Sequence, residues 1–134
     1  MGTWDVGPFD NDTAADFCGA LDDASDGDRL GLVRAALSDA AGADEDLDAD
    51  VAQTAVAAAA LVAAQCPGGE PVDPVYGPEQ PLPGLLSLRT SAHQALDRVL
   101  SDDSELLELW SESDGEPWRR SVEALRRVLR APAE

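Results

Sequence analysis

Apolar residues recur at intervals of three and four along most of the chain, which is the spacing of one face of an α-helix. Strand-like alternation of apolar and polar residues is almost absent. The pattern therefore predicts an all-α fold, with residues 1–134 forming a single compact domain of about six helices. These helices cover about 13–24, a stretch that follows Asp26, then about 48–65, 85–100 and 106–110, and a last stretch that starts at Asp114-Gly115-Glu116-Pro117.

Each predicted helix keeps one apolar side, and glycine or proline separates several of them. The first two are close enough in sequence to predict a helical hairpin, and the second is expected to end at Gly42. The residues that form the apolar sides include Ala14, Phe17, Cys18 and Leu21, then Leu30, Val33 and Leu37, then Leu88, Ala92, Leu96 and Val99, and finally Trp118, Val122, Leu125 and Leu129.

The third predicted helix is unusual because it is rich in alanine and apolar on most of its sides over residues 51–64. A helix of this kind normally lies at the centre of a protein or at an oligomer interface. Two interpretations therefore stay open, a central helix and a homodimer formed through this stretch.

Residues 66–84 break the helical pattern, since they hold six prolines and four glycines. Proline fixes φ and removes the amide donor, so we expect an extended strap between the third and fourth helices. Tyr76 and Leu82 are the side chains of this strap that we expect to pack against the helices. The alternative is a proline-rich ligand for an aromatic groove, although no basic residue accompanies the Pro-x-x-Pro spacings.

Charge narrows the choice of partners. The 134 residues include 27 acidic side chains, nine arginines and no lysine, for a formal net charge of -18. Such a field opposes phosphate backbones and anionic lipids, so we expect neither nucleic acid nor a membrane as partner. The N-terminal region has neither a basic segment nor a long apolar run, and together with the absence of a membrane-spanning stretch this predicts a cytoplasmic protein.

The negative charge is unevenly placed. Residues 1–83 carry 17 acids and two arginines, whereas residues 84–134 carry ten acids and seven arginines. Fourteen of the 27 acids lie at predicted helix starts, where free amides and the helix dipole favour them. We expect the arginines of the last helix, Arg119, Arg120, Arg126, Arg127 and Arg130, to pair with acids of the first three helices, with a solvated helix face as the alternative.

Residues that carry catalytic chemistry are scarce. His93 is the only imidazole, and Cys18 and Cys66 are separated thiols, which we expect to be reduced and partly buried rather than joined or reactive. Neither a phosphate-binding glycine loop nor a four-ligand zinc set occurs. The alternating acids that start at Asp44 resemble a calcium loop but lack its glycine and its final glutamate. We therefore assign no catalytic residue, metal or cofactor.

The N-terminal segment 1–12 supplies Trp4 and Phe9, two large apolar side chains suited to anchoring the segment on the helical body. Its acids can cap the first helix. The alternative is a small pocket or partner patch, whose candidate binding residues are Trp4, Asp10, Asn11, Asp12 and Asp16.

Several stretches resemble an uncharacterised bacterial family, domain of unknown function 4259. They are Met1-Gly2-Thr3-Trp4 with Gly7 to Phe17, the stretch from Ala58 to Gln65, the Pro71 to Pro78 strap, and Asp102 to Trp110. The resemblance covers most of the chain, and Val6 is a minor departure. It implies relatives but no reaction, cofactor or catalytic residue.

Two classes of function fit these observations. The first is a non-enzymatic protein whose acidic side binds a basic partner, for example an immunity-type inhibitor of a basic toxin. The second is a carboxylate-based enzyme, or a binder of a small ligand or divalent metal, that uses the N-terminal acids.

Overall fold

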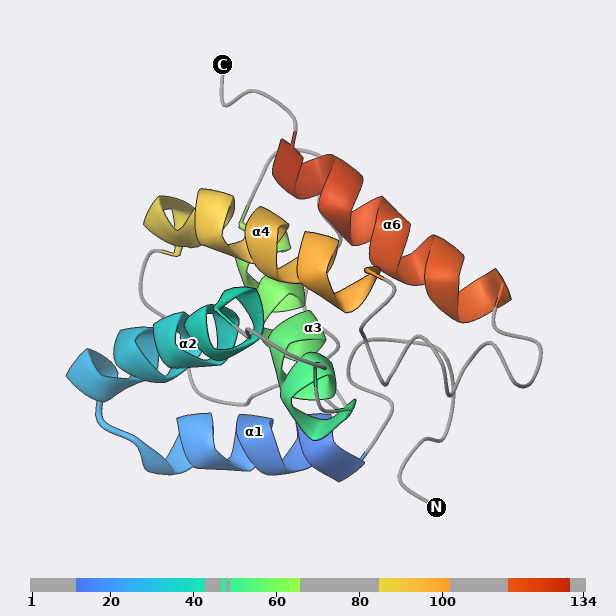
Figure 1. Ribbon diagram of the computed structural model, residues 1–134. Helices are drawn as coiled ribbons and strands as arrows, with labels where there is room; N and C mark the ends of the chain where they lie inside the picture. The colour runs from blue at the N-terminus through green and yellow to red at the C-terminus, as the bar shows by residue number, and fades with distance from the viewer. Residues whose placement is uncertain (1–11, 43–46, 48, 66–84, 102–115, 131–134) are drawn as a thin grey trace.

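The computed structural model describes residues 12–42, 47, 49–65, 85–101 and 116–130, and its elements are all helical (Figure 1). They are α1 (Asp12–Asp23), α2 (Asp26–Ala41), α3 (Ala49–Ala63), the short 3-10 helix η1 (Leu86–Leu88), α4 (Arg89–Val99) and α6 (Glu116–Arg130). The all-α prediction is confirmed for these residues. The predicted anchor 1–12 apart from Asp12, the strap 66–84 and the helix 106–110 lie outside them. None of the described helices is both long and apolar enough to cross a bilayer.

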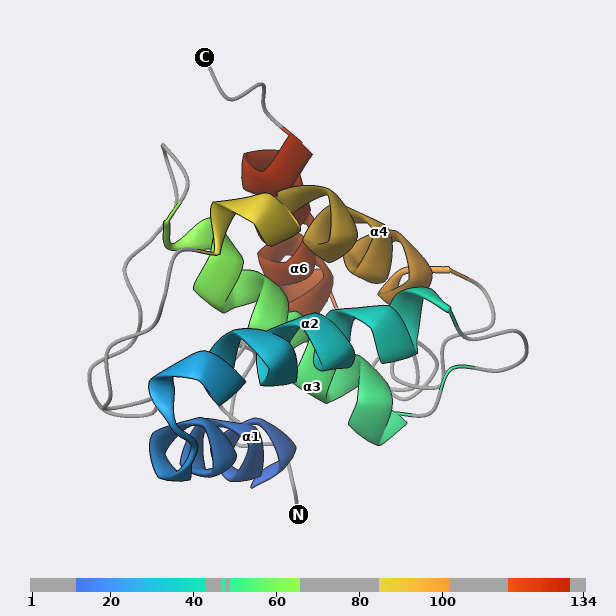
Figure 2. The ribbon, with the colours of Figure 1, turned by 90° about the vertical axis from the view of Figure 1, so that its left-hand side faces the viewer.

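Helix α3 lies at the centre and packs against α1, α2, α4 and α6. Figures 1 and 2 show it running through the middle of the other helices. Residues 55–63 are all buried, as expected for a helix covered from several sides. The central position accounts for the alanine content, because small side chains let neighbouring helices approach closely. Residues 55–63 are therefore covered within one chain, and the homodimer expected through 51–64 stays a prediction.

The expected hairpin of α1 and α2 is not how these helices pack. The contacts of α1 are chiefly with α3, whereas α2 packs on α3 and α4. Arg29, which is only 6% exposed, donates from Nε to the Leu21 carbonyl oxygen at 2.8 Å and ties the end of α1 to the first turn of α2. The buried apolar residues of both helices belong to one hydrophobic core that includes α3.

Hydrogen bonds between a side chain and the backbone hold two other junctions. Arg89 at the start of α4 donates to the carbonyl oxygens of Leu129 at 2.8 Å and Val128 at 3.1 Å, so it satisfies acceptors in the last turn of α6. The Leu85 amide donates to Oε1 of Gln65 at 2.7 Å. This bond brings together the residues on either side of segment 66–84.

Candidate functional site

The structure describes only part of the predicted N-terminal site. Trp4, Asp10 and Asn11 lie outside the described residues, and Asp12 is the first residue of α1. Asp16 lies on α1 and is exposed. Within the described ranges, no group of three or more His, Cys, Asp or Glu side chains is placed to hold a metal ion. The pocket or patch expected around these five residues therefore stays a prediction.

The described parts of α1, α2 and α3 carry an excess of exposed carboxylates. We call Asp16, Asp23, Asp28, Asp39 and Asp50 the acidic surface, since all five are exposed. The same parts hold one exposed arginine, Arg34, because Arg29 is buried at the junction of α1 and α2. The negative charge of the first half of the sequence thus reaches solvent almost without compensation from these helices.

Two members of the acidic surface share a cleft between α2 and α3. Its volume is about 180 Å³, and it is lined by Ala36, Asp39, Asp50, Val51 and Thr54. Thr13 Oγ1 donates to Asp50 Oδ1 at 3.4 Å, and Thr54 Oγ1 donates to the Asp50 carbonyl oxygen at 2.9 Å. The cleft combines an apolar wall with two carboxylates, which suits the stem and the charged head of a lysine or arginine side chain.

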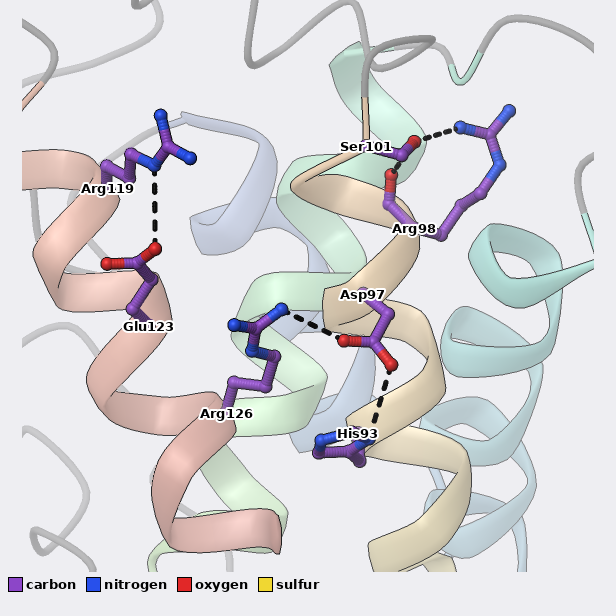
Figure 3. A network of polar contacts seen from close by, with 7 residues as sticks. All are labelled: His93, Asp97, Arg98, Ser101, Arg119, Glu123 and Arg126. Atoms are coloured by element: carbon purple, nitrogen blue, oxygen red, sulfur yellow. Dashed lines mark hydrogen bonds and ion pairs between the residues drawn. The ribbon is translucent and has the colours of Figure 1, made fainter.

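Basic side chains gather instead on α4 and α6, where a polar network joins the two helices (Figure 3). Asp97 lies between two partners, with His93 Nδ1 3.4 Å from Oδ2 and Arg126 Nη1 3.0 Å from Oδ1. Arg119 Nε lies 3.5 Å from Glu123 Oε2 within α6. These α6 arginines therefore pair with α4 and with α6 itself rather than with the first three helices. The prediction is wrong for Arg119 and Arg126, because their acidic partners are Glu123 on α6 and Asp97 on α4.

His93 has no nucleophile beside it among the contacts of this network. Its side chain is 26% exposed, and its partner is the carboxylate of Asp97 one turn along α4. Ser101 and Arg98 close the same helix, since Ser101 Oγ donates to the Arg98 carbonyl oxygen at 2.6 Å and accepts from Arg98 Nη1 at 2.7 Å. The arrangement joins helices and finishes a helix end, and we assign it no catalytic role.

Cys18 is a free, buried thiol on α1, as predicted. Burial, and to a lesser extent the negative charge of Asp22, raises its pKa from 9.0 to about 12. The folded protein therefore favours the neutral thiol, and the corresponding stabilisation is fully present below about pH 9 and declines as the pH rises toward 12. A thiol of this kind is a poor nucleophile at neutral pH.

We therefore expect Cys18 to react slowly with iodoacetamide at pH 8 in the folded protein and rapidly in concentrated urea. The measurement is the alkylation rate by mass spectrometry in a Cys66→Ser background, which leaves Cys18 as the single thiol. Equal rates in the two conditions would contradict the burial of Cys18.

The cleft residues escaped sequence reasoning for a structural reason. Asp50 follows the predicted start of the third helix at residue 48, where an acid is explained by the helix dipole alone, and it does lie in the first turn of α3. Asp39 lies in the second half of α2, eleven residues before Asp50, and nothing in the local pattern relates the two. Only the packing of α2 against α3 brings them to one cleft.

Comparison with known families gives one match, to the family described as Domain of unknown function (DUF4259), over residues 2–121. No curated protein and no solved structure matched the chain. The match spans most of the sequence, including α1 to α4 and the first turns of α6. The chain therefore belongs to the DUF4259 family.

Proposed function

We propose that this protein is a non-enzymatic interaction protein whose acidic surface binds a basic protein partner. The observation that carries the proposal is the exposure of Asp16, Asp23, Asp28, Asp39 and Asp50 with Arg34 as the single exposed arginine in the described parts of α1 to α3. Complementary charge raises the association rate and discriminates against wrong partners. An inhibitor that covers a basic toxin, as immunity proteins do, is the most concrete form of this function.

The cleft between α2 and α3 is the place where such a partner would insert a cationic side chain. Asp39 is exposed at one side, while Asp50 is held by the hydroxyl of Thr13. Ala36 and Val51 offer apolar contact for the methylene groups of the inserted side chain. Charge attraction would bring the partner near, and this contact would fix its position.

The proposal is tested by neutralising two charges on the acidic surface. We expect Asp28→Asn combined with Asp39→Asn to slow association with the partner about tenfold at low salt, because complementary charges steer the encounter. The partner is first captured from native lysate on the immobilised wild-type chain, identified, purified and then measured by surface plasmon resonance over a range of salt concentrations.

A matched control removes two negative charges that lie outside the acidic surface. Asp97→Asn combined with Glu123→Gln changes the net charge equally on α4 and α6 and should leave the association rate within about twofold, as expected for charges outside the interface. The proposal fails if both double variants slow association equally, or if the captured partner is acidic.

A further inference from the structure

Helix α6 presents a second charged surface, of the opposite sign. Arg119, Arg120 and Arg127 are exposed and Arg126 is partly exposed, while Trp118, Val122 and Leu129 of the same helix are buried. The four arginines lie on one side of the helix because they are spaced by one, six, seven and eight residues. We call these four side chains the arginine face.

The acids near α6 only partly compensate the arginine face. Glu123 pairs with Arg119 at 3.5 Å, and Asp97 pairs with Arg126 at 3.0 Å. Neither Arg120 nor Arg127 forms an ion pair with an acid among the residues whose side chains the structure describes. Carboxylates greatly outnumber arginines in this chain of net charge -18, so the charge count alone predicts that every α6 arginine pairs with a carboxylate of the same chain.

The position of α6 explains why its arginines do not neutralise the acidic surface. Its contacts are mainly with α4 and α3, and Figure 1 shows it on the side of the molecule away from α1. At physiological salt, charges separated by more than about 8 Å are largely screened from each other. The arginine face therefore acts locally on whatever approaches it, despite the overall negative charge.

We propose that the arginine face of α6 is a separate docking surface for a carboxylate-bearing helix of another protein. Arg120 and Arg127 are seven residues apart, which places them about 10 Å apart along the helix axis on the same side. An acidic helix with carboxylates seven residues apart repeats this distance. Each guanidinium presents parallel donors that match a carboxylate in a two-bond geometry.

Charge complementarity favours this occupant over other anions. A nucleic acid carries charge along its whole length, so beyond the arginine face it would meet a chain in which 27 carboxylates stand against nine arginines. A second copy of the chain carries the same large charge. A helix with a few carboxylates carries little total charge, so the short-range attraction of the arginines exceeds the repulsion.

A defined peptide provides the probe. It is a fluorescein-labelled, alanine- and glutamine-based helix of 16 residues with glutamate at positions 4, 5, 11 and 12, and its control has glutamine at these four positions. We expect the glutamate peptide to bind the full-length protein in fluorescence anisotropy at 50 mM salt, and the glutamine peptide to bind at least tenfold more weakly. Raising the salt to 300 mM should weaken binding several-fold, because the contact is electrostatic.

Charge variants locate the binding. Arg120→Glu combined with Arg127→Glu should weaken glutamate-peptide binding at least tenfold. Arg120→Gln combined with Arg127→Gln should also weaken binding at least tenfold, although it changes the net charge of the protein less. Arg34→Glu, on the exposed arginine of α2, is the control for the double glutamine variant, since both change the net charge by two units. It should leave the affinity unchanged, and circular dichroism verifies that each variant is folded.

Three results would overturn the proposal. The first is absence of binding to the wild-type chain, or binding that the Arg34 variant weakens as much as the α6 variants do. The second is tighter binding of a single-stranded oligonucleotide with the same dependence on Arg120 and Arg127, which would assign the face to nucleic acid. The third is self-association of the wild-type chain in light scattering that the α6 variants abolish, which would assign the face to a second copy.

Discussion

Replacing Trp118 by alanine is expected to lower the free energy of unfolding by about 3–5 kcal/mol, the usual range for truncating a buried tryptophan. Trp118 is 5% exposed and belongs to the common hydrophobic core, although it lies in the first turn of a helix whose other side is rich in arginine. It is the largest buried side chain of α6. Its loss removes apolar burial from the core that α6 shares with the other helices.

The measurement for Trp118→Ala is urea unfolding followed by far-ultraviolet circular dichroism. If α6 separates from the remaining helices before they unfold, the transition will also broaden and its slope will fall, because less surface is exposed in each step. Arg120→Ala is the control in the same helix, and as an exposed substitution it should change stability by no more than about 0.5 kcal/mol. A loss below about 1 kcal/mol for Trp118→Ala would contradict its place in the core.

Enlarging Ala58 to leucine is expected to destabilise the fold by about 1–3 kcal/mol through overpacking. Ala58 is fully buried on α3, which is surrounded by α1, α2, α4 and α6. Three additional carbon atoms would have to push neighbouring helices apart or adopt an unfavourable rotamer. Thermal or urea unfolding measures the effect.

Ala35→Leu supplies the matched control for this change, since Ala35 is an exposed residue of α2. Alanine and leucine have similar helix propensities, so the control should be nearly neutral. If Ala58→Leu were as stable as the control, α3 would have room around it. The explanation of the alanine run by close helix packing would then be wrong.

The arginines of this protein have two different roles. Arg29 and Arg89 satisfy carbonyl oxygens within the fold, with Arg29 at Leu21 and Arg89 in the last turn of α6. The α6 arginines instead reach solvent, and the acidic surface lies on other helices. A net charge therefore describes this protein poorly, because the two signs lie on different helices.

Much of the described fold followed from periodicity. The helices expected at 13–24, after Asp26 up to Gly42, and at 48–65 correspond to α1, α2 and α3, and that at 85–100 corresponds to η1 with α4. Local rules suffice for such elements, since apolar spacing and helix-breaking residues mark them within a short window. The family could also be recognised from the sequence, because the stretches that resemble it are defined by their residues alone.

The candidate site was less accessible to sequence reasoning. Asp16 was named and is exposed, but the cleft at Asp39 and Asp50 was not foreseen. The partners of Arg119 and Arg126 were also misassigned, because helical spacing says which residues share a face but not which helix that face meets. Which charged side chains pair between helices depends on how the helices pack, and the number of charges in each segment does not determine that packing.

The sequence by itself determined the helical class, the positions of the described helices and the charge difference between its halves. Only the tertiary structure decided that α3 is central, that α1 and α2 pack on α3 rather than as a hairpin, and that α6 lies on α4 and α3. The physical reason is that helix formation follows from local spacing, whereas the choice of neighbours depends on the burial of all apolar sides at once.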